Sequence, residues 1–356
     1  MKRCANSTRA AKESRPAVAK PDVIEKDDVA GMHLVDYSDP KKLERVPTRD
    51  GFGKGLVEAG RRDRNVIGIC ADLSESTRME AFKTAFPERY IEIGVAEQLL
   101  AAMASGLAAS GKVPFIASYA MFDPGRSWEQ IRTTMALNDT NVKIAGAHAG
   151  VSVGPDGATH QAIEDIAIMR VIPNMTVVVP CDAHQTMKAT LAVAARWGPA
   201  YLRFGRDKSA VLTTEETPFE IGKAQIFRSG SDVAIVACGI LVENALLAAQ
   251  ELARDGIECR VINNHTIEPM DETTLVEAAR ACRAVVTVEE HQVRAGMGSR
   301  VAEILAANEP VPMEFVGVQN AFGQSGTPTE LIEHYGMGTK SIVAAVRKVL
   351  KRKKSR

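Results

Sequence analysis

The sequence predicts an α/β protein made of two successive open domains, each built on a largely parallel sheet. Short apolar, β-branched runs alternate with helical patterns along most of the chain, and such alternation is typical of βαβ units. The alternation pauses in a Thr-, Glu- and Pro-rich stretch at 213–218 and then resumes, which indicates a linker. We therefore expect a polar, disordered tail over 1–45, a first domain over 46–214 and a second over 219–352.

The first series supplies five strands and five helices. The segment 95–110 carries Leu99, Leu100, Met103 and Leu107 among many alanines, and apolar residues on nearly every face predict a buried helix. The expected strands are 66–71, 113–118, 142–147, 176–180 and 200–204, and the expected helices are 49–60, 95–110, 126–138, 161–169 and 182–196.

The second series has the same character. Its expected strands are 232–237, 258–263, 284–289 and 313–318, and its expected helices are 241–255, 271–281, 297–308 and 339–351. The chain closes on a basic run at 351–356. Cations complement a helix C-terminus, so we interpret this run as a solvated basic tail and not as a nucleic-acid site.

Composition excludes several classes of protein. The 356 residues contain 44 Lys and Arg and 44 Asp and Glu, which gives a formal net charge of zero. A general nucleic-acid or membrane-surface binder needs a basic excess, although a local basic pocket for a phosphorylated small molecule remains compatible. None of the six cysteines forms a C-x-x-C pair, and no run of 18 apolar residues occurs. A reduced, cytoplasmic protein without a transmembrane helix is expected.

The most informative stretch is the loop from His148 to Gln161. It contains two histidines, Asp156, a threonine and three glycines, directly after an apolar run at 142–147. Open α/β sheets place their chemistry in loops of this kind, and histidines exchange protons near neutral pH. A metal site is the rival interpretation, but zinc ligands rarely occur without a third His or Cys nearby. The sequence has no Gly-Asp-Gly followed by a metal-ligating Asn, so the loop resembles half of an active site.

Four motifs together resemble the thiamine-diphosphate-dependent family that includes transketolase. They are Glu92-Ile-Gly-Val-Ala-Glu97-Gln98, Tyr119-Ala-Met-Phe122, the His148–Gln161 loop, and Gly323-Gln-Ser-Gly-Thr-Pro328 with Glu330-Leu-Ile-Glu. The resemblance covers roughly 47–350 and corresponds to the pyrimidine-binding and C-terminal domains. The missing Gly-Asp-Gly belongs to the family's other domain. The chain is thus similar to the separately encoded C-terminal subunit of a split transketolase.

The resemblance implies roles for the cofactor-side residues. Glu97 would hydrogen-bond N1′ of the cofactor's aminopyrimidine and favour the imino tautomer that removes a proton from the reactive carbon, which requires a carboxyl in a dry site. Tyr119 and Phe122 would pack that ring. Without the resemblance, Glu97 would be interpreted as a helix-start carboxylate that complements the dipole. Arg126 lies in a stretch where family members vary, and it receives no role.

The resemblance also implies a substrate channel. His148, Asp156 and His160 would orient the sugar hydroxyls and move protons, although Asp156 alone could simply shape a turn. Arg49, Ser76 and Arg206 would contact the terminal phosphate, because guanidinium forks and hydroxyls suit phosphate oxygens. A register error of one or two residues would put Ser74 and Arg203 in their place. The histidines of the second domain, His265 and His291, are expected to be structural.

The expected activity is reversible transfer of a two-carbon ketol unit between phosphosugars. An N-terminal transketolase subunit would hold the diphosphate and its Mg²⁺ or Ca²⁺, so this chain would carry no metal of its own and would be inactive alone. Two copies of each chain would form the assembly. Three alternatives remain open: a 1-deoxyxylulose-5-phosphate synthase-like enzyme, a 2-oxoacid dehydrogenase β-like subunit, and a non-catalytic scaffold.

Overall fold

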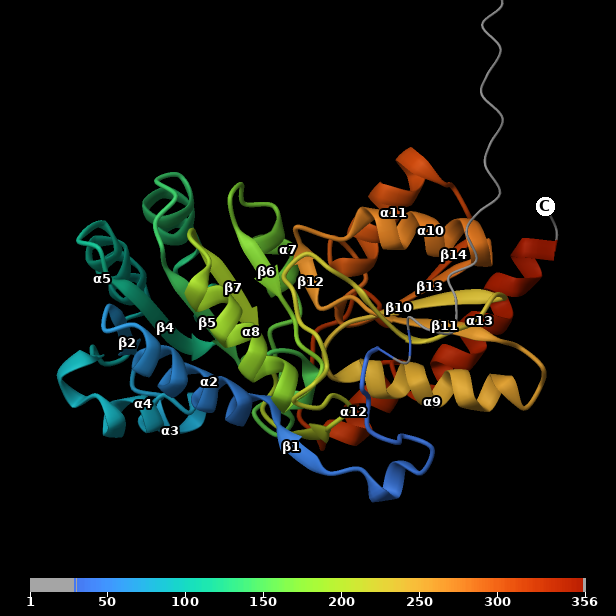
Figure 1. Ribbon diagram of the computed structural model, residues 1–356, viewed down its shortest axis with the longest axis horizontal. Coiled ribbons are helices and arrows are strands. Elements are labelled where there is room, and N and C mark those ends of the chain that lie inside the picture. Colours follow the sequence, from blue (N-terminus) through green and yellow to red (C-terminus); the bar gives the residue numbers. More distant parts are fainter. Residues whose placement is uncertain (1–28, 30, 355–356) are drawn as a thin grey trace, which may run out of the picture.

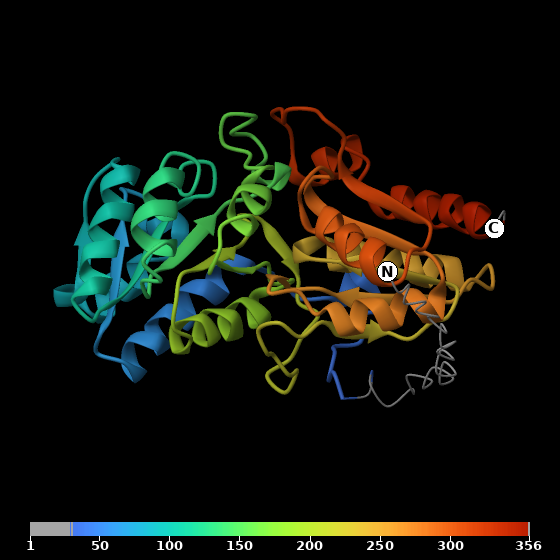
Figure 2. The ribbon, with the colours of Figure 1, turned by 90° about the horizontal axis from the view of Figure 1, so that it is seen from above.

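The protein has two α/β domains that lie side by side (Figures 1 and 2). The computed structural model describes residue 29 and residues 31–354. Within these residues the strands form a seven-stranded sheet, a five-stranded sheet and a two-stranded ribbon. The predicted fold class, two largely parallel α/β sheets in succession, is confirmed.

The first sheet has the order β12-β6-β7-β5-β4-β2-β3. All of its pairs are parallel except β12 with β6. Residues such as Ile69, Ile116 and Ile144 are fully buried, as expected for strands covered on both faces. The strands are β2 (Val66–Cys70), β3 (Tyr90–Glu92), β4 (Val113–Tyr119), β5 (Lys143–Ala147), β6 (Thr176–Val178), β7 (Ala200–Arg203) and β12 (Thr266–Glu268).

Helices cover both faces of the first sheet. One face packs against α5, η3 and α7 through a core that includes Leu100, Met135 and Met169. The other face packs against α2, α4 and α8 through Phe52, Phe82 and other residues. The segments are α2 (Thr48–Arg62), α3 (Ser74–Thr77), α4 (Glu80–Ala85), η2 (Pro87–Arg89), α5 (Glu97–Ala109), α6 (Trp128–Gln130), the π-helix η3 (Ile131–Ala136), η4 (Val151–Val153), α7 (Asp165–Arg170) and α8 (Ala183–Ala195).

The second sheet has the order β14-β13-β10-β11-β9, with only β9 antiparallel. Its strands are β9 (Gln225–Arg228), β10 (Val233–Ala237), β11 (Cys259–Asn263), β13 (Val285–Gln292) and β14 (Met313–Val318). Its helical segments are η5 (Gly239–Leu241), α9 (Val242–Ala253), α10 (Glu272–Cys282), α11 (Met297–Asn308), α12 (Pro328–His334) and α13 (Thr339–Lys354).

The structure adds short elements that sequence periodicity did not predict. The strands β3, β9 and β12 lie at sheet edges, and β1 (Arg45–Pro47) pairs only with β8 (Lys208–Ala210). Runs of three or four residues are too short to show alternation. Strand β12 has a further consequence, because it belongs to the second half of the chain and yet completes the first sheet beside β6. The two domains therefore share a sheet edge.

Two expectations about the ends of the chain need correction. Residues 1–28 of the predicted tail lie outside the described residues, but 31–45 have a fixed place. Met32, Leu34, Tyr37 and Leu43 pack on the core of the second domain, and η1 (Pro40–Lys42) forms a short turn. At the other end, Lys353 Nζ donates to the backbone oxygens of Asp232 and Cys282. The basic run therefore helps to attach the end of α13 to the second domain and is not simply solvated.

Candidate functional site

The predicted site residues converge at one edge of the first sheet. Parallel strands β2, β3, β4, β5 and β7 all end at this edge, which is where open α/β sheets bind ligands. The segments that follow these strands carry Ser76, Glu97, Tyr119 with Phe122, the His148–Gln161 loop, and Arg206. Arg49 joins them from the first turn of α2.

Glu97 begins α5 and is only 4% exposed. Both carboxylate oxygens lie 3.1 Å from Nη1 of Arg126. A surface pocket of about 550 Å³ opens directly beside this pair, lined by Val95, Ala96, Glu97, Gln98, Leu99 and Arg126. Val95 and Leu99 are 69% and 49% exposed, which is unusual for large apolar side chains that flank a buried acid. The carboxyl thus lies at the base of an apolar, open rim.

Four rings form a compact aromatic cluster next to that pocket. Tyr119 and Phe122 are nearly parallel, with centroids 6.1 Å apart. His148 lies 4.2 Å from Tyr119, and His160 meets Phe122 edge-on at 5.2 Å. The Arg126 guanidinium lies 4.4 Å from the Phe122 ring centroid. Phe122 is therefore in contact with the predicted channel histidine on one side and with the arginine that holds Glu97 on another.

His148 is held as a neutral imidazole. It is 1% exposed, and burial lowers its pKa to about 3, with nearby Arg49 and Arg206 acting in the same direction. Nε2 lies 3.1 Å from the backbone oxygen of Ser76. Nδ1 is buried without a partner. Buried polar atoms are normally satisfied, so Nδ1 is the ring nitrogen that is left to hydrogen-bond a ligand.

Arg49 and Ser76 lie beside His148. Arg49 Nη1 donates to the Ser76 backbone oxygen at 2.9 Å and lies 3.2 Å from His148 Nε2. Its Nε atom is buried without a partner. Burial lowers the pKa of Arg49, and the nearby Arg78 adds to this effect. Ser74, the alternative to Ser76, lies toward Tyr90, away from this group.

Arg206, not Arg203, is the partly exposed arginine beside the His148–Gln161 loop. Arg206 Nη1 donates to Asp156 at 2.9 Å, and both side chains remain partly exposed. Arg203 is buried and donates to Asp165 at 2.7 Å and to the backbone oxygen of Glu290 at 2.8 Å. Since Arg203 is occupied by these partners, the alternative in which it contacts a phosphate loses its support.

The second domain holds the His148–Gln161 loop in place through hydrogen bonds. Glu290 on β13 accepts the Ser152 backbone N–H at 2.6 Å, and Gln161 donates to the Gln324 backbone oxygen at 2.9 Å. A Cβ on Gly150 would collide with the Glu290 carboxyl. Position 150 therefore requires glycine for two reasons: the space beside Glu290 admits no Cβ, and the backbone φ is +85°.

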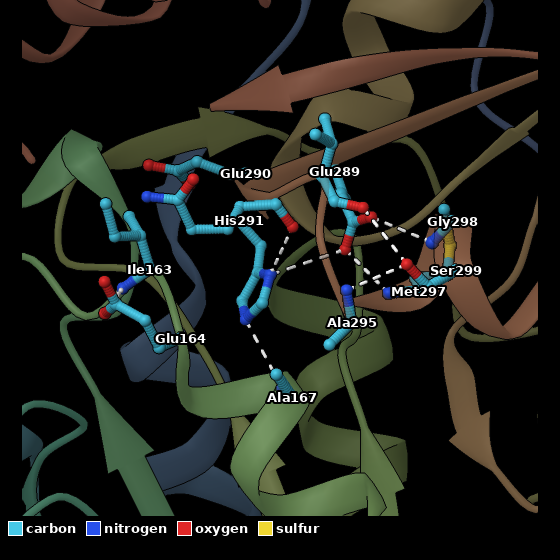
Figure 3. A network of polar contacts seen from close by, with 12 residues as sticks. Ile163, Glu164, Ala167, Glu289, Glu290, His291, Ala295, Met297, Gly298 and Ser299 are labelled. Carbon is cyan, nitrogen blue, oxygen red and sulfur yellow. Dashed lines mark hydrogen bonds and ion pairs between the residues drawn. The ribbon is translucent and has the colours of Figure 1, made fainter. Parts of the chain in front are cut away.

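His291 connects the two domains in the same region (Figure 3). Its Nδ1 lies 2.7 Å from the Gln292 backbone oxygen, and its Nε2 accepts from the Ala167 N–H at 3.3 Å. The adjacent Glu289 caps the start of α11 by accepting from Met297 and Gly298 N–H groups. His291 is fully buried, as is His265, which lies beside Phe219. Neither histidine takes part in the predicted channel, and their contacts are structural.

Sequence reasoning missed Asp123 and gave Arg126 no role. Asp123 is fully buried beside Phe122, accepts from Ser127 Oγ at 2.5 Å, and leaves Oδ2 without a partner. Burial raises its pKa to about 7, and the charge of Glu97 adds to the increase. An acid inside an aromatic turn is the signal that could have revealed it, since unpaired buried carboxyls are rare.

The structure describes no metal centre and no membrane helix in the part of the chain that it covers. Among residues 29 and 31–354, no group of three or more His, Cys, Asp or Glu side chains is arranged to hold a metal ion. No helix in the same residues is both long and apolar enough to cross a bilayer.

Comparison with known proteins identifies the family. The transketolase pyrimidine-binding domain model matches residues 44–210, and the transketolase C-terminal domain model matches residues 222–342. The chain belongs to the transketolase family. The first match contains every predicted site residue from Arg49 to Arg206, and the family is the one that the sequence motifs indicated.

Individual transketolase relatives match the chain over most of their own length. A 6-deoxy-6-sulfo-D-fructose transketolase subunit, SqwH, from a Clostridium species is 40% identical over 88% of this chain and 98% of its own. A subunit of an apulose-4-phosphate transketolase from Phocaeicola vulgatus is 35% identical over 83% and 95%. A solved structure described as a split-gene transketolase, inactive β4 tetramer, superposes with a TM-score of 0.82 at 45% identity and covers 86% of this chain and 99% of its own.

Proposed function

We propose that this chain is the pyrimidine-binding, C-terminal subunit of a thiamine-diphosphate-dependent transketolase. The observation that carries the proposal is the position of Glu97, a buried carboxyl that lines an open pocket and whose partner Arg126 lies over the Phe122 ring. A carboxyl that can share a proton with a ring nitrogen, next to an aromatic face, fits an aminopyrimidine. When bound, thiamine diphosphate supplies the carbanion chemistry of ketol transfer.

The protein's own residues would bind and orient the sugar. Neutral His148 offers Nδ1 to hydrogen-bond a substrate hydroxyl, and His160 lies across Phe122 from Arg126, where it can hold or move a proton at the reacting hydroxyl. Asp156, positioned by Arg206, would accept from another hydroxyl. These contacts fix the sugar against the cofactor and supply the proton handling that the transfer needs.

Arg49, Ser76 and Arg206 would bind the terminal phosphate of the sugar. Arg49 Nε is a buried donor without a partner, and Arg206 stays partly exposed with a single side-chain partner, Asp156. The two guanidinium groups add to the effect of burial in lowering the pKa of the nearby His148, and together they favour a dianionic ligand. This cluster supports a phosphosugar as substrate.

The chain would require an N-terminal partner subunit that holds the diphosphate and its Mg²⁺ or Ca²⁺. The exposed apolar side chains around Glu97, including Val95 and Leu99, support a surface that another polypeptide covers. The similarity to the split-gene transketolase structure supports the same arrangement. We propose an assembly with two copies of each chain. This chain without its partner would be inactive. We propose a cytoplasmic location for the assembly.

A reconstituted complex tests this function. The chain is co-purified with the N-terminal subunit, and retained thiamine diphosphate is measured together with ketol transfer from xylulose 5-phosphate to ribose 5-phosphate. Glu97→Gln should lower the rate on the order of 10²- to 10⁴-fold, whereas the control Glu80→Gln, at an exposed position, should not. Turnover of pyruvate instead would favour a 1-deoxyxylulose-5-phosphate synthase-like or dehydrogenase-like enzyme. Full activity in Glu97→Gln would contradict the catalytic role of Glu97 and would favour the non-catalytic scaffold alternative.

A further inference from the structure

Arg126 already makes the two contacts that we propose for the aminopyrimidine. Its Nη1 atom lies 3.1 Å from each oxygen of Glu97, and its Cζ atom lies 4.4 Å from the centroid of the Phe122 ring. A guanidinium is planar and stacks on aromatic faces as a flat heterocycle does. One side chain thus contacts both Glu97, which lines the pocket beside α5, and the neighbouring Phe122 ring.

Two other rings lie around Phe122. Tyr119 is nearly parallel to it, at an interplanar angle of 12°, and His160 meets it edge-on at 5.2 Å. Arg126 contacts Phe122 and Glu97 from a single position. A flat ring that makes both contacts from that position has to replace the Arg126 guanidinium.

The ion pair also holds Glu97 in the wrong hydrogen-bonding role. Beside Arg126 the Glu97 carboxylate accepts from the guanidinium. An aminopyrimidine ring nitrogen is itself an acceptor, so it needs a proton from the carboxyl. Replacing Arg126 by the ring therefore converts Glu97 from acceptor to donor, and one proton has to reach the carboxyl in the exchange.

Arg126 is placed so that it can leave. Its side chain is 53% exposed, and among the described residues no hydrogen bond or ion pair other than the one to Glu97 holds its guanidinium. Half-exposed ion pairs of this kind contribute little. By contrast, the backbone around it is fixed, since Arg126 N–H donates to the Phe122 oxygen at 2.8 Å. The side chain can swing away without unfolding the turn.

We propose that Arg126 is a displaceable stand-in for the aminopyrimidine, so that its ion pair with Glu97 and cofactor binding exclude each other. The inference rests on the proposed function, because it concerns how the same pocket is filled before the cofactor arrives. In the free subunit the arginine contacts both oxygens of Glu97 and covers the Phe122 ring. Cofactor binding then has to overcome the loss of both contacts.

Isothermal titration of thiamine diphosphate into the complex with the N-terminal subunit tests the proposal. Arg126→Ala should bind the cofactor roughly 3- to 30-fold tighter than the wild type, the range set by an exposed ion pair and one cation–π contact. Arg126→Lys should be intermediate, because an ammonium keeps the charge but not the stacking plane. Arg132→Ala, at an exposed position on η3, is the matched control and should bind as the wild type does.

The outcomes separate this proposal from the function beneath it. If the wild type binds thiamine diphosphate and Arg126→Ala binds it equally or more weakly, Arg126 is not a stand-in, and the inference is overturned while the function stands. If no complex binds the cofactor, wild type included, the proposed function fails and the inference fails with it.

Discussion

Two arginine–carboxylate pairs in the first domain differ in almost every respect. Arg203 and Asp165 are both buried, and the pair has further support from Tyr201, which donates to Asp165 at 2.7 Å. In the other pair, both Glu97 oxygens contact a single guanidinium nitrogen of Arg126, and the Arg126 side chain is half-exposed. The first pair lies where the two domains meet, since Arg203 also donates to the Glu290 backbone oxygen, and the second faces the open pocket. The buried pair has further partners that hold it, whereas the half-exposed pair is the one that we propose is exchanged for the cofactor.

The buried aspartates near these pairs differ in the same way. Burial alone would raise the pKa of Asp165, but Arg203 and its hydrogen bonds bring the pKa below the usual value. Asp123 has only Ser127, and its pKa rises to about 7. The domain junction therefore supplies a cation for its buried acid, whereas the pocket edge leaves its acid unpaired.

Removing the buried arginine should produce the largest effect. Arg203→Ala leaves Asp165 and the Glu290 carbonyl without their donor, and breaking a buried pair costs about 3–5 kcal/mol. Urea denaturation of the chain should show this loss in the free energy of unfolding. A change below about 1 kcal/mol would contradict the contrast between the two pairs.

Asp123→Asn should change how stability depends on pH. The folded-state pKa of Asp123 is raised to about 7 from 3.8, so its contribution is fully present below the unfolded pKa and is lost as pH rises through the folded pKa. At about 1.36 kcal/mol per pKa unit, the loss approaches about 4 kcal/mol by pH 8. Asn does not titrate, so the free energy of unfolding of the variant should rise relative to that of the wild type between pH 4 and pH 8. Urea denaturation of both proteins at each pH measures this difference. If the stability of the two proteins changed with pH in the same way, a raised pKa of Asp123 would be refuted.

Gly150→Ala should destabilise the loop attachment. The new Cβ would collide with the Glu290 carboxyl, which also lies beside Arg203, and φ at this position is +85°. Strained backbone of this kind costs on the order of 1–3 kcal/mol. Gly106→Ala is a suitable control, because a Cβ there meets nothing within 4 Å and should be neutral or slightly stabilising in α5. Equal melting temperatures for the two variants would show that the contact with Glu290 is unimportant.

Arg126→Ala should have the smallest effect on stability. The ion pair and the one cation–π contact of the half-exposed Arg126 side chain contribute about 2 kcal/mol or less in total. The free energy of unfolding measured in urea should fall by no more than that amount. A loss as large as that of Arg203→Ala would mean that both arginines are structural, which would remove the basis for an exchangeable pair.

The two α/β domains, the family and the set of residues at the sheet edge could be predicted from the sequence. Periodicity is a local property, and the motifs that resemble the family are short, so the resemblance was enough to select Glu97, Phe122, His148 and Arg206. The choice of the predicted phosphate-binding arginine was open in the sequence, because Arg203 and Arg206 stand only three residues apart on and just beyond one strand.

The contacts of these residues depend on the tertiary structure. Arg203 is buried against Asp165 and the second domain, whereas Arg206 stays partly exposed beside Asp156. The turn after β4 brings Arg126 onto both Phe122 and Glu97, which are 25 positions apart in the chain. Edge strand β12 joins the first sheet from the second half of the chain. Contacts between distant segments depend on how the chain packs, and no local pattern of residues encodes them.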